Sequence, residues 1–373
     1  MQLDRRRCLA AVGLALGSLE MPGWASVEAN PAGRTTSVRA RLSLNENPYG
    51  PAPGVRPALE REFGELCRYT GAGYDALVEA VARKERIPPD QIILGEILEP
   101  LGTHLSLTGG PGGEFIYSDP GYTALIDSAV AVGGRAVPVP LTRSLENDLT
   151  ALAANINART RALYLVNPHN PTGTVSDPRQ FKLFARDAAQ RALVIVDEAY
   201  LEYADGFDAR TLTDLVREGA NVIVFRTFAK VYGLAGLEIG YGLMPKRIAS
   251  VLKAQGFTNP HLFNRLAVAA ATASLQDPVY VEHVRQLVAG ERQRWIELLR
   301  SLGRRVTPSA ANFIFFETGM PHAEFAARLS DQGVEIGREF APYERWARVS
   351  IGLPEENSIA RDAVRRLLGA TGA

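Results

Sequence analysis

VIVFRTFAK, residues 222–230, begins with four apolar residues and ends in a threonine and a lysine that follow the strand. A run that is apolar at both odd and even positions is typical of a strand buried on both faces of a parallel sheet. Similar runs lie at residues 115–117, 162–166, 193–196 and 239–243. Segments with helical spacing, such as 122–132 and 177–190, separate them, and Asp177 is a plausible N-cap. We therefore predict an α/β fold whose mainly parallel sheet is covered by helices.

The pattern changes after about residue 260. Long helical stretches at residues 266–275 and 284–302 precede short strands near 312–316 and 347–351. We interpret this part as a second, smaller α+β domain at the C-terminus.

Composition points to chemistry on small molecules. The chain has 373 residues, of which 46% are hydrophobic and 22% charged, an ordinary globular balance. Its 41 basic and 41 acidic residues give a formal net charge of zero. A neutral surface has no overall attraction for nucleic acid or anionic membrane, so we expect neither as a partner of the mature protein.

The first residues are typical of a bacterial twin-arginine export signal. Arg5, Arg6 and Arg7 precede an apolar run at residues 10–19, too short for the roughly 20 residues that span a bilayer. We expect residues 1–29 to be this signal and the protein to be periplasmic, or cytoplasmic if the leader does not function. Asp4 and Cys8 depart from the usual signal pattern. Loss of the leader would leave Cys67 as the single cysteine, so no disulfide forms within the mature chain.

Lys230 is unusual in a chain that uses arginine for most of its positive charge. Only five of the 41 basic residues are lysines. An amine can lose its proton and form an imine, which a guanidinium cannot do. Taken alone, its position favours a solvated loop lysine over a catalytic one, so its neighbours decide.

Polar residues follow three of the expected strands. Residues 162–166 lead to Asn170, residues 193–196 lead to Asp197 and Tyr200, and residues 222–225 lead to Thr227 and Lys230. Ligands of open parallel sheets bind beyond the carboxyl ends of the strands. Pyridoxal phosphate chemistry needs this set, because a lysine holds the aldehyde as an imine and a carboxylate pairs with the ring nitrogen.

From residue 42 to the end, the chain resembles fold type I pyridoxal phosphate-dependent aminotransferases of class I/II, and most closely their histidinol-phosphate aminotransferase branch. The resemblance rests on LNENPYGP (44–51), DPGY (119–122), NPTG (170–173), DEAY (197–200), Lys230 with GLAGL (233–237), and ARVSIG (347–352). It implies a large cofactor domain at 70–258 and a small domain at 259–373. Residues 30–69 would pack on the small domain and on the partner subunit of a homodimer.

The resemblance also implies roles around the cofactor ring. Lys230 is the expected imine lysine and the base that moves the substrate proton. Asp197 is expected to pair with the ring nitrogen, Asn170 and Tyr200 with the ring oxygen, and Tyr122 to stack on the ring.

Further residues are expected at the cofactor phosphate and at the substrate. Thr227 would donate to the phosphate beside a loop containing Gly95 and Glu96, and Tyr69 would reach it from the partner subunit. The expected substrate-binding residues are Arg348 for the α-carboxylate, which suits its planar fork, and Tyr49 and Arg338 for the side chain. We expect no metal site, because the histidines lack ligand spacing.

The expected phosphate site departs from the family pattern. Glu238 stands where an arginine is usual, Ala229 replaces a serine, and the phosphate loop is shortened to residues 95–97. A carboxylate about 4 Å from the phosphate would cost on the order of 4 kcal/mol at an effective dielectric near 20. Glu238 must therefore turn away, pair with a base such as Arg226, or be protonated, and we expect a weakened hold on the cofactor.

Three functions remain open at this stage. The first is transfer of an amino group between an amino acid or amine and a 2-oxo acid. The second is another reaction on the same cofactor, namely decarboxylation, racemisation or oxidation. The third is a degenerate relative that binds a ligand without turnover. Export would separate the protein from cytoplasmic histidine synthesis, which argues against histidinol phosphate as the substrate.

Overall fold

Seven strands form the central sheet in the order β2-β8-β7-β6-β5-β3-β4. All neighbouring pairs are parallel except those made by β8, which runs antiparallel to both β2 and β7. The strands are β2 (Ile92–Leu94), β3 (Glu114–Asp119), β4 (Arg135–Pro140), β5 (Thr160–Val166), β6 (Leu193–Asp197), β7 (Val222–Thr227) and β8 (Gly240–Leu243). The predicted mainly parallel α/β fold is confirmed.

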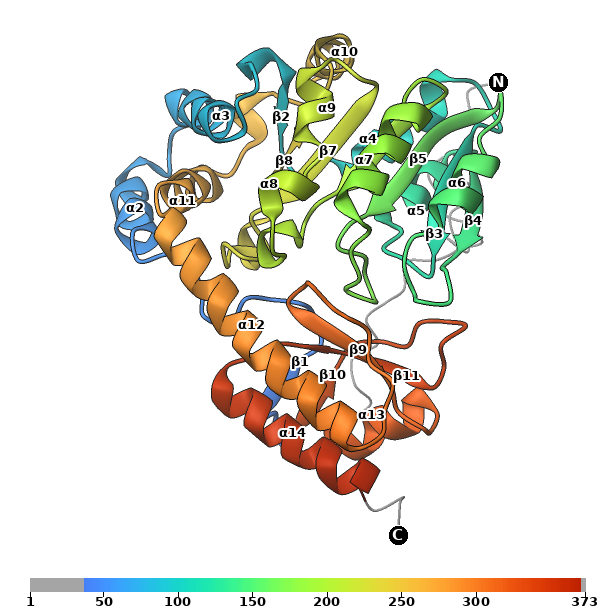
Figure 1. The fold of residues 1–373 in the computed structure, drawn as a ribbon. Coiled ribbons are helices and arrows are strands. Elements are labelled where there is room, and N and C mark those ends of the chain that lie inside the picture. The colour runs from blue at the N-terminus through green and yellow to red at the C-terminus, as the bar shows by residue number, and fades with distance from the viewer. Residues whose placement is uncertain (1–36, 370–373) are drawn as a thin grey trace, which may run out of the picture. The chain divides into compact units, whose positions relative to one another are not determined.

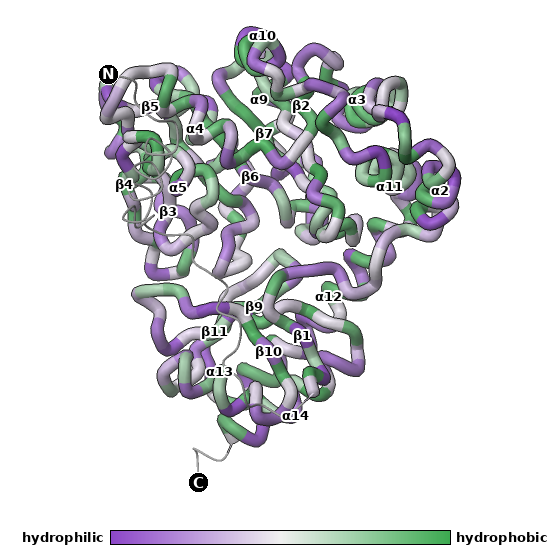
Figure 2. The backbone as a smooth tube through the Cα atoms, turned by 180° about the vertical axis from the view of Figure 1, so that it is seen from behind, coloured by the Kyte–Doolittle hydropathy of each residue, from purple (hydrophilic) through white to green (hydrophobic). Residues whose placement is uncertain are grey.

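The central strands are buried on both faces, as their apolar sequences predict. In β7, Val222 and Val224 belong to one hydrophobic cluster, while Ile223 and Phe225 belong to another on the opposite face. The hydropathy colouring of the backbone follows β7 as a largely green segment inside the molecule (Figure 2). Period-two alternation therefore assigns every residue of these strands to one of two helical layers.

Helices cover both faces of the sheet (Figure 1). Apolar residues of α4, α5 and α10 pack with Ile223 and Phe225, while residues of α3, α7 and α9 pack with Val222 and Val224. The side chain of Asp177 caps α7 by accepting a hydrogen bond of 2.9 Å from the Gln180 N–H, as predicted. The helices of this part are α2 (Val55–Glu62), α3 (Ala72–Glu85), α4 (Leu98–Thr108), α5 (Ala124–Ala131), α6 (Leu149–Ala154), α7 (Pro178–Ala188), α8 (Phe207–Arg210), α9 (Thr213–Arg217) and α10 (Lys246–Ala254).

The C-terminal residues build two small sheets, each of two strands. β9 (Phe313–Glu317) pairs antiparallel with β11 (Trp346–Ser350), while β10 (Val334–Ile336) pairs parallel with the N-terminal strand β1 (Ala40–Leu42). The long helix α12 contacts β9 and also the turn after β6, and thus joins both parts of the chain (Figure 1). The helices here are α11 (Arg265–Leu275), α12 (Pro278–Ser301), α13 (His322–Ser330) and α14 (Pro354–Gly369).

This computed structural model describes residues 37–369. The expected export signal at residues 1–29 lies outside them, and the domain limits at 69/70 and 258/259 stay predictions. Within 37–369, no helix combines the length and apolar character needed to cross a bilayer.

Candidate active site

Lys230 lies in the connection between β7 and β8, at the carboxyl edge of the sheet. Because Thr227 pairs with Gly240, both ends of this connection are fixed to that edge. The Nζ atom of Lys230 lies 5.8 Å from the centre of the Tyr200 ring, and its side chain is half-buried. Residues 44–51 pack against the same connection, since Asn47 donates a hydrogen bond of 2.8 Å to the carbonyl of Val231.

A glycine permits this close approach of the N-terminal segment. Gly233 has φ of +70°, and a Cβ atom there would lie 2.3 Å from the carbonyl oxygen of Gly50. A larger residue would therefore push residues 44–51 away from the lysine.

Asp197 is the last residue of β6 and is 3% exposed. Its Oδ1 accepts a hydrogen bond of 2.9 Å from the Ala199 N–H, and its Oδ2 accepts one of 3.2 Å from the Tyr164 hydroxyl. Burial raises the pKa of this carboxyl to about 6, although the nearby charge of Lys230 lowers it. The carboxylate thus lacks a direct cationic partner within the described residues, and a positively charged ring nitrogen would supply one.

Two tyrosines lie around Asp197 and Lys230. Tyr200 is buried, and its hydroxyl accepts a hydrogen bond of 3.2 Å from Nδ2 of Asn45. Tyr122 is 43% exposed, yet desolvation of its hydroxyl, with the charges of Glu99 and Asp197, raises its pKa. An exposed ring beside a buried acid suits stacking on a flat ligand.

Arg348 projects from β11 toward the loop after β5. Its two terminal nitrogens donate hydrogen bonds of 2.8 Å to Oδ1 of Asn170 and to the carbonyl of Ser43. Its buried Nε has no partner. The rings of Phe340 and Phe313 lie 5.2 and 5.7 Å from the guanidinium, and burial lowers its pKa to about 10. A buried guanidinium without a carboxylate partner in residues 37–369 is prepared to bind the carboxylate of a ligand.

A carboxyl group lies at the expected phosphate end. The Thr227 hydroxyl donates a hydrogen bond of 2.7 Å to Oε1 of Glu96 and accepts one of 3.0 Å from the Ala229 N–H. Glu96 is exposed as a whole residue, but desolvation of its carboxyl group raises the pKa to about 7. Gly95, with φ of +119°, donates its N–H to the carbonyl of Gly240 and so fixes this loop to β8. The hydroxyl expected to hold a phosphate therefore already has an acceptor.

Glu238 turns toward solvent, which settles how the chain accommodates this substitution. It is exposed, has φ of +46°, and makes no hydrogen bond or ion pair with the residues that the structure describes. The suggested pairing with Arg226 is wrong. Arg226 is 1% exposed and binds Glu198 at 2.9 Å and Glu85 at 3.1 Å on the opposite face of the sheet.

Three predicted residues do not join the Lys230 group through a described contact. Tyr69 is 71% exposed; its ring lies 4.6 Å from the His261 ring between centroids, and its carbonyl accepts a hydrogen bond of 2.7 Å from Arg265. Tyr49 has a buried hydroxyl without a partner. Arg338 is exposed, but it lies 4.2 Å from the Phe340 ring on which Arg348 also lies, so these two arginines border one space.

Two residues of the site were missed by sequence reasoning. Asn45 belongs to the motif at residues 44–51, yet its Nδ2 donates a hydrogen bond to the Tyr200 hydroxyl, and its Oδ1 accepts one of 2.9 Å from the Ser350 hydroxyl. Tyr164 has the sequence features of an ordinary strand residue. Side chains two positions apart in β5 point to the same face of the sheet, and only this alternation hints that Tyr164 faces Asp197 at the end of the neighbouring strand β6. The contact of Asn45 has no signal in local sequence.

The ring half of a pyridoxal phosphate fits these residues. An amine, a buried acid without a cationic partner, a phenol hydroxyl and an exposed tyrosine ring converge at Lys230, Asp197, Tyr200 and Tyr122. At the phosphate end the structure offers the Thr227 hydroxyl together with the Glu96 carboxyl group. Within residues 37–369, no cluster of side chains suited to a metal ion is present.

Comparison with known proteins agrees with this geometry. Residues 40–364 match the family model of class I and II aminotransferases, and the chain belongs to that family. It is a pyridoxal phosphate-dependent aminotransferase.

Among its relatives, histidinol-phosphate aminotransferase 2 of Pseudomonas fluorescens (strain Pf0-1) is 37% identical over 334 residues, 88% of each chain. The aromatic amino acid aminotransferase of Thermobifida fusca is 35% identical over 332 residues, 88% of this chain and 89% of the relative. The structure of histidinol-phosphate aminotransferase from Sinorhizobium meliloti in complex with pyridoxal 5'-phosphate matches with a TM-score of 0.82 and 29% identity. That match covers 95% of this chain and 100% of the other.

Proposed function

We propose that Lys230 carries the cofactor and moves the proton during amino transfer. The observation that supports this most directly is its Nζ atom, which lies beside the Tyr200 ring and within electrostatic reach of the buried Asp197. When bound, pyridoxal phosphate supplies an aldehyde that combines with amines and a ring that withdraws electrons from the substrate carbon.

The other residues around Lys230 bind the cofactor ring and orient it. Asp197 holds positive charge at the ring nitrogen through its carboxylate, and Tyr164 and Ala199 keep that carboxylate in place. The Tyr200 hydroxyl and the Asn170 amide act as donors to the ring oxygen. Tyr122 covers the ring and excludes water from one face.

Arg348 binds the α-carboxylate of the amino donor in our proposal. Its guanidinium is buried, fixed by Asn170 and Ser43, and has one nitrogen still unsatisfied. Phe313 and Phe340, whose rings lie beside this guanidinium, would contact the side chain of the donor. Tyr49 and Arg338, which the sequence predicts for the same role, would also contact it. We favour aromatic amino acids, because one group of relatives carries that name and Phe340 borders the arginine.

Histidinol phosphate is the second candidate donor, since other relatives are named for it. Expected export argues against it, because a periplasmic enzyme would be separated from cytoplasmic histidine synthesis. We propose that the twin-arginine leader directs such export. Substituting Arg6→Lys breaks both possible arginine pairs, so cell fractionation should then find the protein in the cytoplasm; unchanged location would contradict the proposal.

Two measurements test the assignment of Lys230. Borohydride treatment of the cofactor-loaded protein should fix the cofactor on a peptide containing Lys230, and Lys230→Ala should abolish the label. Lys182→Ala, at a half-buried lysine paired with Asp214, is the matched control and should leave the label intact. Label on another lysine would contradict the assignment.

A screen of purified holoenzyme tests the reaction itself. Aromatic amino acids, histidinol phosphate and other amines are combined in turn with a panel of 2-oxo acids. Transfer of the amino group with any pair supports the aminotransferase, and the preferred donor decides between the two substrate classes. Release of carbon dioxide, loss of chirality or consumption of oxygen without transfer would favour the alternative reactions.

A further inference from the structure

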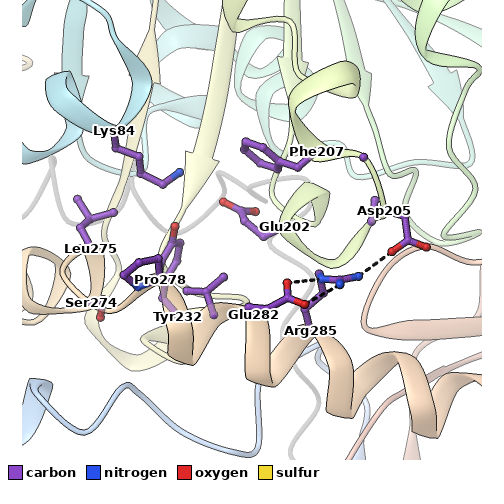
Figure 3. A pocket seen from close by; sticks show the side chains of 13 residues that line it. Lys84, Glu202, Asp205, Phe207, Tyr232, Ser274, Leu275, Pro278, Glu282 and Arg285 are labelled. Carbon is purple, nitrogen blue, oxygen red and sulfur yellow. Dashed lines mark hydrogen bonds and ion pairs between the residues drawn. The ribbon is translucent and has the colours of Figure 1, made fainter.

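A second cavity lies apart from the site around Lys230. It has a volume of about 400 Å³ and lies between the end of α3, the loop after β6, the end of α11 and the first turns of α12 (Figure 3). None of the residues assigned to cofactor or substrate lines it. Its size is within the range of small-molecule sites in proteins, about 300–1,000 Å³. We call it the Glu202 pocket.

The walls of the Glu202 pocket are largely apolar, and its cations already have partners. Apolar surface comes from Phe207, Tyr232, Leu275, Pro278 and Val281. The Lys84 ammonium pairs with Glu85 at 2.8 Å, while Arg285 binds Asp205 at 2.6 Å and Glu282 at 2.7 Å, as the dashed lines of Figure 3 show for the latter pairs. Neither cation is left to attract an anion into the pocket.

Two buried polar groups in the pocket lack partners. Oε1 of Glu202 and Oγ of Ser274 make no hydrogen bond, although the two residues are only 8% and 1% exposed. Figure 3 shows the Glu202 carboxyl group between Lys84 and Phe207, inside the ring of lining side chains. Burial raises the pKa of Glu202. A buried polar atom without a partner is costly, and such atoms in a cavity indicate a place for a ligand.

The charges around the pocket indicate the charge of that ligand. Behind the pocket, Arg226 and Lys84 pair with Glu198 and Glu85. Glu202 lies within electrostatic reach of both cations and adds a third carboxylate to these two positive charges. With Glu202 ionised, the group carries one uncompensated negative charge, and a cation in the pocket would neutralise that charge and favour the ionised form.

We propose that the Glu202 pocket binds a small organic cation with a hydrocarbon body. Its positive charge pairs with the Glu202 carboxylate, and its hydrocarbon part packs against Phe207, Leu275 and Val281. The Tyr232 ring is suited to such a ligand, because aromatic faces attract cations. The Phe207 ring already lies 4.5 Å from the Arg226 guanidinium and 5.4 Å from the Lys84 ammonium, so it contributes apolar packing area only.

Benzyltrimethylammonium is a suitable probe for cofactor-loaded, full-length protein. It has the required charge and ring, and without an N–H bond it cannot form an imine with the cofactor. Calorimetric titration should give a Kd of about 1 mM or lower. Benzoate and benzyl alcohol, the anionic and neutral comparisons, should bind at least about tenfold more weakly. Equal binding of all three compounds, or no binding of the cation, would overturn the proposal.

Three variants test whether the probe binds in the Glu202 pocket. Glu202→Gln removes the charge without changing shape and should weaken the probe about tenfold. Val281→Phe fills the cavity without changing charge and should abolish binding. This second variant keeps the proposal testable if Glu202→Gln fails to fold. Glu218→Gln, at a surface carboxylate paired with Arg186, is the control and should bind normally. Unchanged affinity in a folded Glu202→Gln or Val281→Phe protein, checked by its melting temperature, would refute the site.

Discussion

The Thr227 hydroxyl donates a hydrogen bond of 2.7 Å to Oε1 of Glu96. Thr227 is the last residue of β7 and the one expected to hold the cofactor phosphate, while Glu96 lies in the short loop before α4. The Glu96 carboxyl group thus accepts the hydrogen bond that the Thr227 hydroxyl is expected to donate to the cofactor phosphate. Burial raises the pKa of Glu96 to about 7, so its charge changes near neutral pH.

We expect Glu96→Gln to tighten cofactor binding about tenfold at pH 8, because a carboxylate that repels the phosphate is replaced by a neutral amide. The amide oxygen still accepts from Thr227. The gain should shrink as pH falls through about 7, where the native carboxyl group becomes protonated. Titration of apoprotein with pyridoxal phosphate, followed by absorbance, measures both effects. Equal affinity of the two proteins at pH 8 would show that the carboxylate does not face the phosphate.

Glu238→Arg should also tighten cofactor binding. The native side chain is exposed and makes no hydrogen bond or ion pair with another described residue, so an arginine there gives up no polar partner. It would restore the positive charge that the family usually places on the phosphate. The same titration measures the effect, and Glu238→Gln separates loss of the negative charge from gain of the positive one. An unchanged or weaker affinity for the arginine variant would contradict the expectation.

Asp197→Asn should stabilise the apoprotein at pH 8. The folded state raises the pKa of Asp197 from 3.8 to about 6, so protonation stabilises the fold below 3.8, and this contribution is lost as pH rises through 6. At pH 8 the ionised group costs up to about 3 kcal/mol, and we expect a gain of roughly 1–3 kcal/mol. Urea unfolding at several pH values should show the gain declining as pH falls below 6. In the holoprotein the same variant should instead weaken cofactor binding.

Arg348→Lys should raise the KM for amino acid donors at least about tenfold, because a lysine cannot make the paired hydrogen bonds of a guanidinium to a carboxylate. Amine donors without a carboxylate serve as the internal control, and their KM should change little. The absorbance of the bound cofactor should also be preserved. An equal loss for both kinds of donor would indicate that Arg348 supports Asn170 and Ser43 rather than the substrate.

Tyr69 tests the homodimer with shared sites that the family resemblance implies. It is 71% exposed in the single chain, as expected for a residue that would serve the site of a partner subunit. Lys230→Ala and Tyr69→Ala should each be nearly inactive alone. A mixture of the two variants, dissociated and reassembled, should regain activity, since one site of each hybrid dimer then has both native residues. Failure of the mixture, with wild type recovering under the same treatment, would exclude a shared site.

Sequence reasoning placed the candidate ring residues at one edge of the sheet, because they follow apolar strands that are consecutive along the chain and neighbours in the sheet. Asp197, Thr227 and Lys230 follow β6 and β7, which are neighbours in the sheet. Partners from distant segments were not predictable. Asn45 reaches Tyr200 across 155 positions of the chain, and no local pattern encodes such a contact.

Arg226 shows the same limit. It lies next to Thr227 in sequence and was suggested as a partner for Glu238, yet alternation along β7 turns the two neighbours to opposite faces of the sheet. Arg226 therefore pairs with Glu85 and Glu198, while Thr227 meets Glu96.

The amino-acid sequence by itself determined the α/β fold, the aminotransferase family and the residues that follow the parallel strands, because apolar periodicity and short motifs are local properties. The tertiary structure alone decided which carboxylates have partners. Glu198 is neutralised by Arg226, Glu238 turns to solvent, and Glu96 lies against Thr227. The charge state of a carboxyl group depends on burial and on neighbours brought from distant parts of the chain, and only folding creates that environment.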